Sequence, residues 1–181
     1  MPFERLLFTS CLLPGKTDFV ENKAKVEIRP EPGETILFFC IDDQSKGADG
    51  CELRKDLWNG RQGERICDLL VFYAKEDRRV LCFVELKDSG SDSGKATEQI
   101  INTYKAMESR LLLRNHYSIQ AFLIGYQGSA PKEHRRYEDK LKKVFKDNFI
   151  LNGRKDDFAP FLRGTHNAKS SRGRSKAGRK R

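Results

Sequence analysis

The chain has 181 residues, of which 38% are hydrophobic and 34% charged, and its formal net charge is +9. This length allows one domain with a hydrophobic core and is short for two. The longest apolar run, residues 36–41, is too short to span a bilayer, and the N-terminal segment lacks the form of a secretory signal. These features exclude a membrane-spanning protein, and we expect a cytoplasmic one.

The excess positive charge is concentrated at the C-terminal end. Residues 169–181 contain seven Lys or Arg and no acid, which leaves 28 basic and 26 acidic residues in the rest of the chain. Such a segment, poor in apolar residues and rich in Gly and Ser, cannot bury enough surface to fold alone. We therefore expect a single domain over residues 1–168 and a disordered basic tail over residues 169–181.

The tail is expected to attract the phosphate backbone of nucleic acid. The alternatives are a solubilising terminus or a nuclear-import signal. The side chains predicted to make the contacts are Arg172, Arg174, Lys176, Arg179, Lys180 and Arg181.

The cysteines and histidines do not indicate a zinc site. The five cysteines include no C-x-x-C pair, and the three histidines are far apart in sequence. Cys40, Cys67 and Cys82 lie in apolar runs, where a cysteine behaves as a small hydrophobic residue. We therefore expect buried free thiols and a reducing compartment.

The clearest structural pattern is a β-hairpin. Residues 66–74 and 79–87 are two β-rich runs separated by the polar residues 75–78. An amphipathic helix is predicted over residues 95–114, because its apolar residues recur at steps of three and four. The apolar residues of this stripe are Ala96, Ile100, Tyr104, Met107 and Leu111.

The other predicted elements surround this hairpin and helix. Together they predict an α/β domain with a mixed central sheet and flanking helices. In chain order they are strands at 25–29 and 34–42, one or two helical turns at 51–58, a strand at 117–125, a charged helix at 131–147 and a short strand at 148–151.

Charged residues in the hairpin carry the candidate chemistry. A turn centred on Glu76 and Asp77 places Asp68 directly opposite Glu85, and Lys87 shares a strand face with Glu85. Like charges facing each other are destabilising, so a cation between them is expected, unless the three residues form a solvated salt-bridge face.

The cation expected at this place is Mg²⁺ or Mn²⁺, because both prefer carboxylate and carbonyl oxygens. The predicted metal ligands are Asp68, Glu85 and the carbonyl of Leu86. Lys87 would orient a water molecule or neutralise charge that develops on a phosphate.

The runs CDLLVFY at 67–73 and FVELK at 83–87 resemble motifs II and III of the PD-(D/E)XK, or restriction-endonuclease-like, superfamily. The resemblance covers about residues 34–125, and Cys67 stands where the superfamily usually has a proline. It implies an αβββαβ core and Mg²⁺-dependent hydrolysis of nucleic-acid phosphodiesters, with Asp68, Glu85 and Lys87 as the catalytic residues.

The resemblance also implies further site residues. Some branches place a Gln early in the helix after the hairpin, and Gln99 takes this role. Lys95, at the start of that helix, is a candidate phosphate contact or a solvated charge. The superfamily often adds a Glu from a preceding helix, for which Glu52 is the first candidate and Glu34 and Glu64 are the reserves.

The expected function is that of a Mg²⁺-dependent deoxyribonuclease, an endonuclease or exonuclease acting in defence, repair or recombination. One alternative is a catalytically inactive nucleic-acid-binding protein on the same scaffold. Another is an RNA-associated basic protein whose acidic pair is structural. By analogy with the superfamily, we expect a homodimer or a larger nucleic-acid-processing complex, without a membrane partner.

Overall fold

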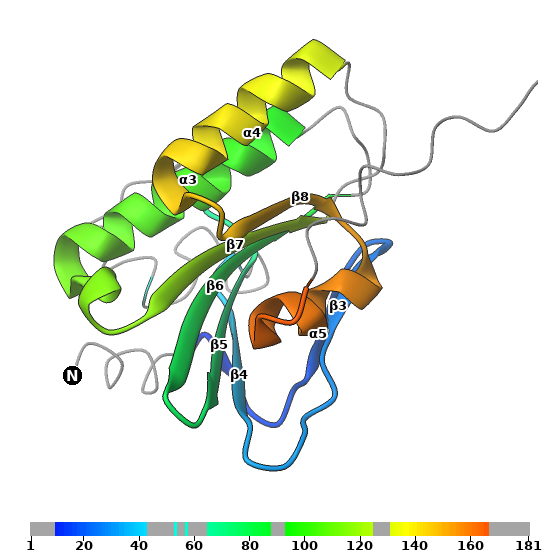
Figure 1. Ribbon diagram of the computed structural model, residues 1–181, viewed down its shortest axis with the longest axis vertical. Helices are drawn as coiled ribbons and strands as arrows, with labels where there is room; N and C mark the ends of the chain where they lie inside the picture. Colours follow the sequence, from blue (N-terminus) through cyan, green and yellow to red (C-terminus); the bar gives the residue numbers. More distant parts are fainter. Residues whose placement is uncertain are drawn as a thin grey trace, which may run out of the picture.

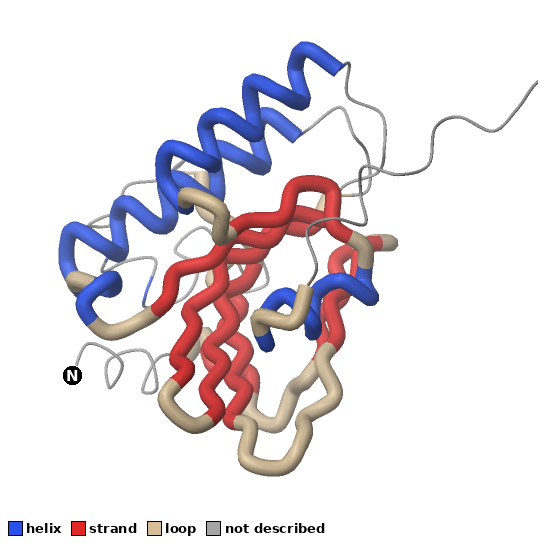
Figure 2. Tube along the Cα trace, in the orientation of Figure 1, coloured by secondary structure: helices blue, strands red, loops and turns tan. Residues whose placement is uncertain are grey.

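A computed structural model describes residues 10–42, 65–87, 93–124 and 131–166, together with Leu53 and Leu57. Its centre is a six-stranded mixed sheet with the order β1-β4-β5-β6-β7-β8 (Figures 1 and 2). The first four strands of this order are antiparallel, and β6, β7 and β8 are parallel. The strands are β1 (Leu12–Leu13), β4 (Thr35–Cys40), β5 (Leu69–Lys75), β6 (Arg78–Leu86), β7 (Ser118–Ile124) and β8 (Phe149–Gly153).

Two layers cover this sheet. Helices α3 (Ser93–Leu111) and α4 (Pro131–Phe145) lie side by side on one face, and a short 3-10 helix, η3 (Leu113–Asn115), follows α3 (Figure 1). Helix α5 (Lys155–Arg163) lies on the other face, next to the hairpin of β2 (Asp18–Glu21) and β3 (Ala24–Glu27). The predicted α/β class with a mixed sheet and flanking helices is confirmed. No helix within these ranges is long and apolar enough to cross a membrane.

The β5–β6 hairpin is apolar throughout because both of its faces are covered. Leu70 and Phe83 belong to the core beneath α3, where the Phe83 ring lies 5.7 Å from that of Tyr104. Val71 and Cys82 belong to a second core that includes Phe158 of α5. A strand that is buried on two faces shows little alternation of polar and apolar residues.

The register of this hairpin is the predicted one. Lys75 pairs with Arg78 across the two-residue turn, and Leu69 pairs with Val84. Glu76, in the turn, has a positive φ of 52°. The predicted stripe of α3 is confirmed as well, since four of its five residues are buried and Leu111 packs against the same core.

Several elements were not predicted. Helix α5 contains Pro160, which normally ends a helix, but the acidic first turn and Gly164 at φ 74° stabilise its two ends. Strands β1 and β2 are too short to give a periodic signal. In the predicted helix at 51–58, Leu53 and Leu57 are helical and buried, and its other residues lie outside the described ranges.

The expectation of free thiols is correct for three cysteines and wrong for one. Cys40, Cys67 and Cys82 are free and buried. Cys11 is disulfide-bonded, and its partner lies outside the described residues. The lack of a C-x-x-C pair excludes only local pairing, so it could not reveal a bond between distant positions.

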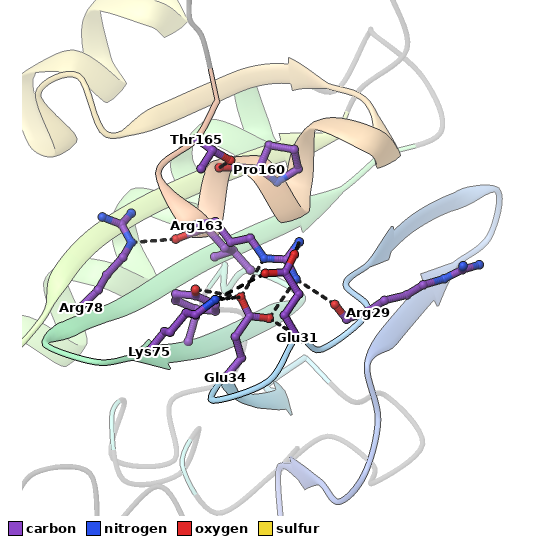
Figure 3. Close-up of polar contacts among 10 residues, drawn as sticks. Arg29, Glu31, Glu34, Lys75, Arg78, Pro160, Arg163 and Thr165 are labelled. Carbon is purple, nitrogen blue, oxygen red and sulfur yellow. Dashed lines mark hydrogen bonds and ion pairs between the residues drawn. The ribbon is translucent and has the colours of Figure 1, made fainter.

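An ionic cluster fastens α5 to the start of β4 (Figure 3). Arg163 donates from Nε and Nη2 to the two carboxylate oxygens of Glu34, each at 2.8 Å, and Nη2 also donates to the carbonyl of Arg29. The Tyr73 hydroxyl lies 3.0 Å from Glu34 Oε1. The hydrogen bond from Arg163 lowers the pKa of Glu34 to about 2, although burial of the carboxylate opposes this shift.

This contact corrects one sequence-based candidate. Glu34 precedes the end of β4 at which Thr35 pairs with Ala74, whereas the chain enters β5 beside the opposite end, at Cys40. Glu34 therefore cannot join Asp68 in a site. Its carboxylate is fully buried in the pair with Arg163, so its role is structural.

We predict that Glu34→Gln lowers the free energy of unfolding by roughly 1–3 kcal/mol at pH 7, because it leaves the Arg163 guanidinium without its charged partner. The pKa of Glu34 lies below its ordinary value of 4.5, so the stabilisation is complete above that pH and is lost as the pH falls toward 2. Urea denaturation at pH 7 and at pH 3 measures the difference. Glu133→Gln, at an exposed glutamate of α4, is the control. An equal effect of Glu34→Gln at both pH values would contradict the prediction.

Candidate active site

Asp68 and Glu85 lie side by side at the end of the β5–β6 hairpin. The backbone amide of Asp68 donates to Glu85 Oε2 at 3.2 Å, and the amide of Leu86 donates to Asp68 Oδ2 at 2.7 Å. Asp68 itself lies one residue before β5, and its carbonyl accepts a hydrogen bond from the Ile41 amide. The two carboxylates are thus held by each other's strand, and the predicted pairing of these residues is confirmed.

Lys87 completes this group. Its Nζ lies 2.7 Å from Glu85 Oε1, and its backbone amide donates to the carbonyl of Ile124, which extends the pairing of β6 with β7. The Lys87 side chain is 22% exposed, whereas that of Glu85 is fully buried. The ammonium can therefore be reached from solvent while it remains beside the buried acid.

The structure adds Glu21, which the sequence analysis missed. Glu21 is the last residue of β2, and the turn at Asn22, where φ is 53°, brings the β2–β3 hairpin to the site. Its carboxyl group hydrogen-bonds to that of Asp68. A local hairpin pattern could have been recognised at Asn22, but no sequence signal connects residue 21 with residue 68.

A pocket opens beside these acids. Its volume is about 570 Å³, and its acidic side chains come from three separate segments of the chain. Asp42, which follows β4, contributes to this lining and was also missed in the sequence. The residues that line the pocket are Leu13, Phe19, Glu21, Asn22, Cys40, Asp42 and Asp68.

Burial shifts the titration of the whole group. Burial, and next the charge of Glu85, raises the pKa of Asp68 to about 9. Burial likewise raises the pKa of Glu85 to about 8, against the lowering effect of Lys87. Burial acts to lower the pKa of Lys87, but its contact with Glu85 outweighs this effect and raises it. Such strong shifts in and beside a pocket are typical of functional sites.

Helix α3 positions the chain segment that leads into Asp68. Gln99 Nε2 donates to the carbonyl of Ile66 at 2.7 Å. The Thr103 hydroxyl accepts from the amide of Cys67 at 2.9 Å and donates to the Gln99 carbonyl. Gln99, a candidate catalytic residue in the sequence, is thus a positioning residue here. Thr103, four residues further along the helix, is a second one that the sequence did not indicate.

The remaining candidates are placed in part. Lys95 is exposed in the first turn of α3, and its contact with phosphate stays a prediction. The contact recorded for Leu86 is made by its amide, so a metal-binding role of its carbonyl also stays a prediction. Glu52, Glu64 and the six basic residues of the tail lie outside the described residues.

Within the described ranges, no group of three or more His, Cys, Asp or Glu side chains is already arranged to hold a metal ion. The donor set nevertheless fits a hard cation. Two buried carboxylate oxygens, Glu21 Oε2 and Glu85 Oε1, make no hydrogen bond in the described structure. Buried oxygens without hydrogen-bond donors are disfavoured, and carboxylates are the ligands that Mg²⁺ and Mn²⁺ prefer.

Comparison of the chain with protein-family models, with curated protein sequences and with solved structures found no match. The functional argument therefore depends on the geometry and electrostatics of the residues themselves.

We predict that Asp68→Asn makes the metal-free protein more stable, by about 2 kcal/mol at pH 8. The folded pKa of Asp68 lies above its ordinary value of 3.8, so its contribution to stability decreases as the pH rises from about 4 toward 9. The asparagine removes this dependence and keeps an oxygen that can accept from Leu86.

Urea denaturation in EDTA between pH 4 and pH 8 measures this gain, which should grow with pH. The matched control is Asp139→Asn, at an exposed aspartate of α4. A loss of stability that is equal at all pH values would contradict the prediction.

Proposed function

We propose that this chain is a metal-dependent nuclease of the PD-(D/E)XK type that hydrolyses phosphodiester bonds, most directly those of DNA. One observation carries the proposal: the buried pair of Asp68 and Glu85 lies beside an acidic pocket, with the Lys87 ammonium 2.7 Å from Glu85. The antiparallel β4–β5–β6 meander, followed by α3 and the parallel strand β7, supports it, because the superfamily core has the order αβββαβ.

Asp68 and Glu85 would hold the cation, with the Leu86 carbonyl as a backbone ligand and Glu21 as a further carboxylate. A bound Mg²⁺ or Mn²⁺ would supply Lewis-acid stabilisation of the phosphate and lower the pKa of the attacking water. The backbone amides of Asp68 and Leu86 fix one oxygen of each acid. The other carboxylate oxygens can then turn toward the pocket.

Lys87 acts as a fixed positive charge. The contact with Glu85 raises its pKa, so the side chain remains an ammonium at neutral pH. In this position it can orient the attacking water and neutralise negative charge on the non-bridging phosphate oxygens. The water oxygen forms a bond to phosphorus and the bond to O3′ breaks. The O3′ oxygen takes up a proton from the solvent, which leaves a 5′-phosphate and a 3′-hydroxyl.

We also propose that the protein acts in the cytoplasm, as a homodimer or in a larger nucleic-acid-processing complex. Three buried free thiols support a reducing compartment. The disulfide of Cys11 is more typical of oxidising compartments, so the state of this residue in freshly isolated protein tests the location directly.

The nuclease activity is tested by incubating the full chain with supercoiled plasmid, linear duplex, single-stranded DNA and RNA. We expect cleavage of DNA with Mg²⁺ or Mn²⁺ and none in EDTA. Asp68→Ala, Glu85→Ala and Lys87→Ala should each slow cleavage by about 100-fold or more, since each removes a group that acts on the reacting phosphate.

The matched controls are Asp139→Ala and Lys105→Ala, two exposed positions away from the pocket, and both should retain the parent rate. Cleavage that persists in EDTA, or in the three site variants, would refute the proposal. Binding of DNA without cleavage by the parent protein would favour the inactive nucleic-acid-binding alternative.

Glu21 is expected to tune the affinity for the cation. We predict that Glu21→Gln raises the Mg²⁺ concentration for half-maximal cleavage several-fold, because the variant keeps the shape of the side chain and loses its charge. At saturating Mg²⁺ the rate should approach that of the parent. Initial rates measured against Mg²⁺ concentration give both values. An unchanged Mg²⁺ dependence would show that Glu21 does not contribute to the cation site.

A further inference from the structure

Helix α4 has one face in the core and a strongly basic face toward solvent. Leu141 and Phe145 are buried against α3 and the sheet. At 100° per residue, the opposite half of the helix carries the exposed side chains Arg135, Arg136, Asp139, Lys142 and Lys143, and Lys146 continues this face beyond the helix end. We call the four basic residues of the helix, Arg135, Arg136, Lys142 and Lys143, the α4 basic face.

Neutralising contacts on α4 lie at the borders of this face. At one border, His134 lies 4.0 Å from Glu138, and at the other Lys140 lies 3.4 Å from Glu98 of α3. In the part of the chain that the structure describes, the four residues of the α4 basic face make no ion pair and no side-chain hydrogen bond. Asp139 is the only acid among them, so the face carries a clear net positive charge.

The α4 basic face begins at the end of the sheet that carries the candidate active site. Helix α3 starts soon after Lys87, and α4 starts soon after Ile124, whose carbonyl accepts from the Lys87 amide. Tyr137 of α4 lies against the start of α3, since a Cβ atom on Gly94 would come within 2.7 Å of its hydroxyl. Figure 1 shows the two helices side by side on the same face of the sheet.

This segregation of charge is not needed for solubility. Without residues 169–181 the chain has 28 basic and 26 acidic residues, so a merely solvated helix could mix the two signs. A row of unpaired guanidinium and ammonium groups instead matches the regular negative charge of a nucleic-acid backbone. Binding there releases condensed counterions, which favours association at low salt. The active-site pocket is acidic, so attraction for the substrate has to come from another surface.

We propose that the α4 basic face binds the phosphate backbone of nucleic acid, as a surface separate from the active site and from the basic tail. That the bound nucleic acid is also the substrate rests on the proposed function. The contacts are to the backbone, so they should depend on salt and show little sequence preference.

The test compares two variants of the full chain that lose the same charge. Arg135→Gln/Arg136→Gln/Lys143→Gln removes three cations from the α4 basic face. Lys16→Gln/Arg29→Gln/Arg79→Gln removes three exposed cations elsewhere. Circular dichroism checks that both variants fold. Fluorescence anisotropy with a short labelled DNA duplex, in EDTA and at several salt concentrations, gives Kd without cleavage.

We expect the α4 variant to raise Kd about 10-fold or more near physiological salt and to reduce the slope of log Kd against log salt by about 2–3. The control variant should stay within about twofold of the parent. Equal weakening in both variants would overturn the proposal, because net charge alone would then explain it. Unchanged DNA binding by the α4 variant would overturn it too, as would a loss confined to vesicles of anionic phospholipid.

The outcome is separable from the test of nuclease activity. If the parent cleaves nothing but the α4 variant still loses DNA binding, the proposed function fails and the binding surface holds. If the parent cleaves DNA and the α4 variant binds and cleaves like the control, the proposed function holds and the binding surface fails.

Discussion

The structure depends on two carboxylates buried beside each other at the end of an apolar hairpin. Asp68 and Glu85 are 4% and 0% exposed, and each accepts a hydrogen bond from the backbone of the other's strand. Burial of two acids in this way is unfavourable unless they are protonated, paired or bound to a cation. The raised pKa of both groups expresses this penalty. Lys87 compensates only Glu85, which leaves Asp68 and Glu21 facing each other.

The rest of the fold supplies the rigidity that this arrangement requires. Because both faces of β5 and β6 are covered, the hairpin cannot shift its register without exposing its apolar residues. On one side α3 holds the entry to β5 through Gln99 and Thr103. On the other side the β2–β3 hairpin adds Glu21. The ion pair of Arg163 with Glu34 fastens α5 across the second core.

The sequence predicted the centre of the site because its residues are connected by local structure. A two-residue turn fixes the register of the β5–β6 hairpin, so the pairing of Asp68 with Glu85 could be derived from the position of Glu76 and Asp77. The stripe of α3 followed from its helical spacing. These features require only short-range geometry.

The errors concern contacts between distant segments. Glu21 reaches Asp68 from a separate hairpin, and no periodicity encodes that meeting. Glu34 was a candidate only by analogy, and its true partner, Arg163, lies on a helix that Pro160 concealed. Cys11 was taken for a free thiol because its bond is not local. Such contacts arise from tertiary packing, which residue spacing alone does not specify.

The central claim is that a divalent cation belongs between the acids of Asp68 and Glu85. A crystal of the protein soaked in Mn²⁺ tests it most directly, through the anomalous difference map at the manganese edge. The account predicts a peak within about 2.5 Å of an oxygen of each carboxylate, and no such peak in a crystal of Asp68→Asn. A map without a peak at these acids, or with manganese only at surface sites, would contradict it.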